Sequence, residues 1–325
     1  MKNIVRKYEF YLFIIIVTLV VFFAVFSDNF LNLENFMDIL ISSSFIGIMA
    51  AGMLVVLISG GIDLSVTAIA TVSQYIMAIT IIDYNGNLFS AFIVAGIIGI
   101  LLGTFNAFLI YYLKAPALII TIATLNLFYG ATIFITKGKW IYNFPEWFNQ
   151  SHNLFSFTSA DGIHRYSGIS LPVVILILVF ILTYIILKYT VLGRKIFAMG
   201  GNAEAARRAG FNMLGLTIFV YCYIGFLSGI GSVGQVLILH SVQPNAIVGR
   251  ELEVIAATVL GGASLAGGAG SVFGTALGVA LLAIVWNGLV IMGVSSYWHN
   301  VIIGLIIIFS VSINAYKRKK TLRGY

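Results

Sequence analysis

Residues 45–79 read FIGIMAAGMLVVLISGGIDLSVTAIATVSQYIMAI, one of the longest apolar runs in the chain. The string GGIDLSV, Gly60–Val66, interrupts this run with two glycines and an aspartate. A central aspartate costs about 2.5 to 3.5 kcal/mol in a membrane helix, so an intramembrane carboxylate usually marks a function. Asp63 is therefore the first candidate functional residue.

The composition identifies an integral membrane protein. Hydrophobic residues make up 60% of the chain and charged residues only 9%, with a mean hydropathy of +1.05. A water-soluble fold of this composition would expose too much apolar surface. The single Cys222 and four scattered histidines, without paired spacing, give no basis for a disulfide framework or a zinc cluster. We predict no metal site and no cofactor.

Ten apolar stretches are long enough to cross a membrane, which requires about 20 residues. We therefore predict an all-α integral membrane protein with about ten transmembrane helices, forming a single domain over residues 1–325. The first stretch is read as an uncleaved anchor, because Phe26 is too large for a signal-peptidase site. The predicted spans are 10–26, 37–59, 65–82, 88–113, 117–136, 171–190, 217–239, 252–268, 271–292 and 298–315.

The distribution of basic residues predicts the orientation. With the N-terminus in the cytoplasm, fourteen of the 18 Lys and Arg residues fall on cytoplasmic segments, as the positive-inside rule requires. Both termini are then cytoplasmic. Residues 137–170 form an external loop and residues 191–216 a cytoplasmic one. The external loop is predicted to lie at the membrane interface through its aromatic residues, Trp140, Tyr142, Phe144, Trp147 and Phe148.

The cytoplasmic loop 191–216 contains the signals of a short helix. Asn202 suits the N-cap and Gly210 the position after the C-cap, while Glu204 and Arg208 complement the two ends of the helix dipole. A capped helix with one small face is suited to a groove on another protein, although a solvated connector has the same signals. The small residues of this helix are Ala203, Ala205, Ala206 and Ala209.

Two glycine-rich segments are predicted to interrupt helices on the same side of the membrane. At the first, Asp63 either caps the third helix or stands at a helix break beside the transport path. The second is GGASLAGGAG at 261–270, and both segments are predicted to frame the inner end of one pathway. The candidate residues are Gly60, Gly61, Asp63, Ser65 and Thr67 in the first segment, and Gly261, Gly262, Gly267 and Gly268 in the second.

Three blocks of sequence carry a family resemblance. GGIDLSV, LGRKIFAMGGNAEAARRAGFN at 192–212 and GRELEVIAATVLGGASLAGGAGSVFGTALG at 249–278 resemble the permease subunits of ribose-type sugar ABC importers. Thr67 departs from the family pattern GIDLSVG, and residues 138–148 look more like the autoinducer-2 and rhamnose branch. The resemblance implies the type II-like importer membrane domain. It also assigns ATPase coupling to Gly201, Asn202, Glu204, Ala205, Ala206, Arg208 and Gly210.

The resemblance further implies a channel-forming subunit that imports a monosaccharide or a similar solute across the inner membrane of a bacterium. Its partners would be a cytoplasmic ATPase, an external sugar-binding protein and a second permease copy or a homologue. The chain would not be an enzyme, because ATP hydrolysis occurs on the partner. Three alternatives remain: an ion-coupled secondary transporter with Asp63 at its ion site, a membrane enzyme, and an ABC permease for branched-chain amino acids.

Overall fold

A computed structural model describes residues 2–149, 153–157, 167–295, 297–298, 301–302, 304–305 and 308. Within these ranges the regular elements are helices, apart from one antiparallel pair of strands, β1 with β2, and an isolated antiparallel bridge between Ile141 and Val242. The elements are α1 Lys2–Phe26, α2 Leu33–Ile58, α3 Val66–Asp83, α4 Leu88–Leu113, α5 Ala117–Thr136, α6 Glu146–Asn149, β1 Asn153–Phe157, β2 Ser167–Ser170, α7 Leu171–Tyr189, α8 Val191–Gly201, α9 Ala203–Arg208, α10 Met213–Leu239, α11 Glu251–Leu260 and α12 Val272–Ile291.

Eight of the described helices are long and apolar enough to cross a membrane, and they match eight of the ten predicted spans. The prediction of one span over 252–268 is wrong. α11 has only ten residues, about 15 Å at the usual helical rise, which is half of a bilayer core. It ends at Leu260 with Gly261 as its C-cap, and Gly262 follows with a φ of +91°, which favours glycine. The predicted span 298–315 lies largely outside the described residues.

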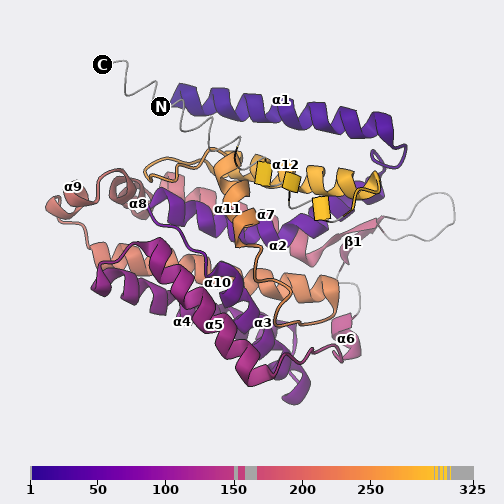
Figure 1. The fold of residues 1–325 in the computed structure, drawn as a ribbon, viewed down its shortest axis with the longest axis horizontal. Coiled ribbons are helices and arrows are strands. Elements are labelled where there is room, and N and C mark those ends of the chain that lie inside the picture. Colours follow the sequence, from indigo (N-terminus) through magenta and orange to yellow (C-terminus); the bar gives the residue numbers. More distant parts are fainter. Residues whose placement is uncertain are drawn as a thin grey trace.

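The central element of the bundle is α2. Every residue from Ile48 to Ile58 is buried, as expected for a helix that is apolar on all sides. α10, α7, α12 and α11 pack around it, and α1 lies on the outside against α12 (Figure 1). The core of the molecule is therefore one helix enclosed by others.

The most extensive helix–helix contact among the described residues is that of α4 with α10, which cross backbone to backbone at glycines. A Cβ atom on Gly99 would overlap the carbonyl oxygen of Gly225, and a Cβ atom on Gly225 would overlap that of Gly99. Small residues four apart permit this approach in membrane helices. Gly103 and Gly229 extend the contact by one turn on each helix.

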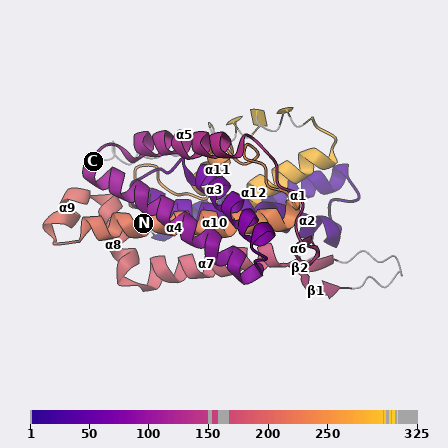
Figure 2. The same ribbon diagram turned by 90° about the horizontal axis from the view of Figure 1, so that it is seen from below.

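The connecting segments gather at two opposite ends of the bundle. α8 and α9 lie at one end with the start of α1, whereas α6 and the β1–β2 hairpin lie at the other (Figures 1 and 2). The aromatic residues predicted to lie at the membrane interface differ in their exposure. Trp140 and Tyr142 are exposed, but Phe144 and Phe148 are buried against the ends of α3 and α10.

Candidate functional site

The break between α2 and α3 is a buried polar cluster. The Asp63 side chain is fully buried, and its Oδ1 accepts hydrogen bonds from the backbone N (2.8 Å) and the Oγ (2.6 Å) of Ser65. The carboxylate therefore accepts a backbone N–H as the sequence suggested, but the N-cap position of α3 is Ser65 itself. Oδ2 of Asp63 has no hydrogen-bond partner among the described residues.

Neighbouring helices hold this break through further polar contacts. Nδ2 of Asn106 on α4 donates to Oγ of Ser65 (2.7 Å), and Oγ1 of Thr121 on α5 donates to the carbonyl of Ile62 (3.1 Å). On α10, the buried Tyr221 places its hydroxyl beside Gly61. Asp63 is thus closed off from solvent in this conformation, and the break is packed against three helices.

Thr67 connects the first glycine-rich segment with α11. Its Oγ1 donates to Oε2 of Glu251 (2.8 Å), and the same oxygen accepts from the backbone N of Gly249 (2.8 Å). Thr67 is fully buried. The first turns of α3 and α11, 184 residues apart, are therefore joined by a hydrogen bond.

Three distant segments meet at glycines, at the end of the bundle that carries α8 and α9. The N–H of Gly268 donates to the carbonyl of Ile58 at the end of α2 (2.8 Å). A Cβ atom on Gly200 would overlap the same oxygen, and one on Gly267 would lie 2.9 Å from Cα of Gly60. We call Gly60, Gly200, Gly267 and Gly268 the glycine junction. It joins both predicted glycine-rich segments to α8.

The short helix α9 forms as the sequence predicts, one residue shorter at its end. Oδ1 of Asn202 accepts from the N of Ala205 (2.9 Å), and Glu204 pairs with Arg208 at 3.2 Å. Gly210 has a φ of +79°, the left-handed conformation expected after a helix C-terminus. α9 is thus capped by its own residues.

The face of α9 differs from the prediction in one respect. Ala203, Ala205 and Ala209 are exposed, but Ala206 is buried, at 4% exposure, against the rest of the chain. Its carbonyl accepts the N–H of Phe211 (3.2 Å), which fixes the chain as it leaves the helix. Gly201 is exposed and has nothing within 4 Å of its Cβ position. The surface open to a partner is therefore the exposed alanines with the charged side chains.

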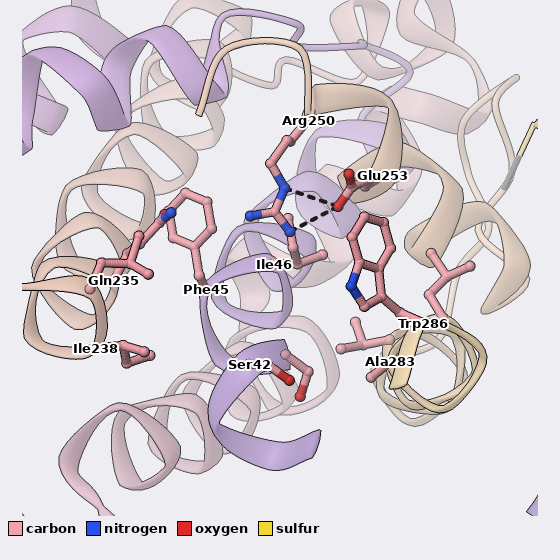
Figure 3. Close-up of a pocket in the computed structure, with 13 residues that line it drawn as sticks. Ser42, Phe45, Ile46, Gln235, Ile238, Arg250, Glu253, Ala283 and Trp286 are labelled. Carbon is pink, nitrogen blue, oxygen red and sulfur yellow. Dashed lines mark hydrogen bonds and ion pairs between the residues drawn. The ribbon is translucent and has the colours of Figure 1, made fainter. Parts of the chain in front are cut away.

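A cavity of about 300 Å³ lies between α2, α10, α11 and α12 (Figure 3). Nε and Nη2 of Arg250 donate to Oε2 of Glu253 at 3.2 and 3.0 Å, and the guanidinium lies 5.9 Å from the ring centre of Phe45. The residues that line it are Ser42, Ser43, Phe45, Ile46, Gln235, Ile238, Leu239, Arg250, Glu253, Val279, Leu282, Ala283 and Trp286.

The sequence did not single out this cavity. Its polar side chains come from separate elements of the fold. The sequence signal for this cavity was a pair of charged residues at an apolar stretch: Arg250 directly precedes the stretch and Glu253 lies within it. Neither Gln235 nor Trp286 stands in a pattern that predicts a site.

The whole chain was compared with known families and proteins. The family model described as branched-chain amino acid transport system / permease component matches residues 35–311. The chain belongs to this permease family. No solved structure matches the chain.

Curated relatives of the permease are named as sugar importers. The ribose import permease protein of Escherichia coli strain K12 is 34% identical, over 94% of this chain and 93% of its own. That of Bacillus subtilis strain 168 is also 34% identical, over 93% and 90%. The L-arabinose transport system permease protein of E. coli strain K12 is 31% identical, over 91% and 87%. The predicted resemblance to ribose-type permeases is confirmed.

Membership of this family identifies the chain as a transport subunit. The chain is a multi-pass membrane subunit of an ABC importer and not an enzyme, since a separate ATPase hydrolyses ATP. Permeases of this kind work with an ATPase and a solute-binding protein.

Proposed function

We propose that this permease forms the membrane channel of an ATP-driven importer for a monosaccharide or a closely similar polyol-like solute. The observation that carries the proposal is the similarity, over more than nine-tenths of the chain, to permeases named for ribose and L-arabinose. The family description names branched-chain amino acids, but these relatives are sugar permeases. Two permease copies, identical or paired with a homologue, would enclose the path.

The test is uptake by proteoliposomes that contain the permease, its partner ATPase and the matching binding protein. We expect uptake of ribose, xylose or L-arabinose that requires ATP and is inhibited by vanadate. Leucine serves as the control solute for the amino acid class. Uptake that follows an ion gradient without ATP, or uptake of leucine alone, would contradict the proposal.

The coupling element is proposed to be α9, held at the cytoplasmic face by α8. Its Asn202 cap and its Glu204–Arg208 pair make it helical without help from a partner. Its exposed Ala205 offers a small surface to a groove on the ATPase. The loop 191–216 is then cytoplasmic and the loop 137–170 external, with both termini in the cytoplasm of a bacterial cell whose inner membrane holds the importer.

Through the glycine junction, α8 connects α9 with the transmembrane helices. Gly200, at the end of α8, touches the carbonyl of Ile58, which also holds Gly268. A displacement of α8 and α9 would therefore act on the end of α2 and on the segment before α12 together. Both predicted glycine-rich segments thus belong to the inner end of the pathway through their contact with α8.

A further inference from the structure

We propose that the cavity between α2, α10, α11 and α12 is a monosaccharide subsite of the transport path. In this subsite Arg250, Glu253 and Gln235 bind ring hydroxyls, and Trp286 packs against the C–H face of the sugar. The inference rests on the proposed function and adds to it a position and a set of side chains. Neither the family description nor the names of the relatives assign these residues.

The cavity is partly open between the helices and lies away from the end that carries the glycine junction. Ser42 and Phe45 lie in the first half of α2, which ends at the junction, and Gln235 lies in the last turns of α10. Trp286 lies in the second half of α12, whose first residues follow the junction. In the proposed orientation, the cavity therefore occupies the middle and external part of the membrane.

Charged side chains at this depth are costly unless they are paired or used. Arg250 and Glu253 are paired, but both hydrogen bonds end on the same oxygen, Oε2 of Glu253. Among the described residues this leaves Nη1 of Arg250 and Oε1 of Glu253 without a hydrogen bond. The pair thus retains one charged donor and one charged acceptor, which suits a ligand hydroxyl that both donates and accepts.

Gln235 supplies an independent observation. The residue is 8% exposed and lines the cavity, and its buried Oε1 has no partner within the described part of the chain. A buried amide without a partner costs free energy, since desolvation is not repaid. A sugar hydroxyl in the cavity would provide the missing hydrogen bond.

Two aromatic rings complete the chemistry of a sugar site. Phe45 is buried beside the guanidinium of Arg250, whereas Trp286 is 37% exposed and faces the cavity from the other side (Figure 3). Flat rings suit the apolar face of a pyranose or furanose, while charged and amide groups suit its hydroxyls. A volume of about 300 Å³ corresponds to a small ligand.

A second cavity lacks the charged and amide side chains of the first. It lies between α1, α2, α7 and α12, and has about 720 Å³. Its lining is aliphatic and aromatic except for Ser43, with no charged or amide side chain. It has no groups that recognise hydroxyls.

The experiment measures uptake by the complete importer in proteoliposomes with Gln235→Leu and Trp286→Leu. In Gln235→Leu the new side chain would fill a similar volume and break no hydrogen bond of the described structure, so the amount of folded permease should stay unchanged. Losing a hydrogen bond to the solute should lower the maximal uptake rate roughly 2- to 10-fold. The concentration of sugar-loaded binding protein that gives half-maximal uptake should stay the same, because the docking surface is intact.

Gln74→Leu is the matched control. Gln74 is also buried, at 2% exposure, but it lies on α3 outside the cavity. We expect wild-type uptake from this variant. Wild-type uptake by both Gln235→Leu and Trp286→Leu would overturn the subsite while leaving the importer function intact. Failure of the wild-type importer to transport any of ribose, xylose and L-arabinose would instead count against the proposed function.

Discussion

Replacing Gly200 by alanine tests whether the glycine junction transmits motion between α8 and the bundle. In an exposed helix this change stabilises by about 1 kcal/mol, because alanine is the better helix former. At Gly200 the added Cβ would overlap the carbonyl oxygen of Ile58 and lie 2.8 Å from the N of Gly268. Since ordinary contacts lie at about 3.5 Å, the backbones would have to separate by roughly 2 Å at the Ile58 oxygen.

The cost of this separation should exceed the gain in helix propensity. Overpacking of a well-packed site costs roughly 1 to 3 kcal/mol, and backbone atoms give way less easily than side chains. The separation would also stretch the hydrogen bond from Gly268 to Ile58, which is 2.8 Å long in the native structure. We expect Gly200→Ala to melt at a lower temperature and to transport less solute for each ATP hydrolysed.

The neighbouring glycine provides the control. Gly201 is the last residue of α8 and has nothing within 4 Å of its Cβ position. Gly201→Ala should therefore keep wild-type stability and coupling. Melting of the purified permease, together with ATP hydrolysis and uptake in the same vesicles, measures both effects. If Gly200→Ala behaves like Gly201→Ala in all three measurements, the junction is not a tight contact and this reasoning fails.

Three further predictions concern orientation, the helix break and α9. In a Cys222→Ser background, an impermeant thiol reagent should label Tyr84→Cys, an exposed position, but not Ala205→Cys in intact cells; the reverse pattern would invert the topology. Asp63→Asn should retain most uptake, because its amide oxygen can still accept hydrogen bonds from Ser65. Asp63→Leu leaves the two buried donors of Ser65 unpaired, which costs about 1 to 3 kcal/mol each, and should reduce the amount of folded protein. Loss of uptake in a well-folded Asp63→Asn would show that the charge itself is required. At the exposed Ala205, Ala205→Trp should weaken co-purification of the ATPase while the permease stays folded. At the buried Ala206, Ala206→Trp should destabilise the permease itself. Equal ATPase binding by Ala205→Trp and wild type would exclude this face of α9 as the contact.

The sequence predicted those parts of the fold that depend on local signals. The spans follow from the length of apolar runs, and α9 follows from a cap, a charge pair and a glycine within nine residues. The span at 252–268 was wrong because glycine satisfies a hydropathy window but does not sustain a helix. At Gly262 and Gly267 the backbone instead takes positive φ angles of +91° and +83°.

The junction and the cavity were beyond the reach of local patterns. The contact of Gly200 with Ile58 and Gly268 joins residues more than sixty positions apart, and glycine has no side chain whose pattern marks a partner. Gln235, Arg250 and Trp286 line the cavity from three different elements. In the sequence, none of them is part of a pattern that marks a site. Only the packing of the helices brings these residues together.

Two helices connect the cavity with the glycine junction. α2 carries Phe45 at the cavity and ends at Ile58, with every residue from Ile48 onward buried. α11 begins after its N-cap Arg250 and ends at Leu260, ahead of Gly267 and Gly268. Gln235 stands on α10, which packs on α2 and is held to α4 by the glycine crossing. Buried helices move as rigid bodies because close packing resists local deformation. A shift imposed on the junction by α8 would therefore reach Phe45 through α2, and Arg250 and Glu253 through α11, and so change the side-chain set that holds the sugar.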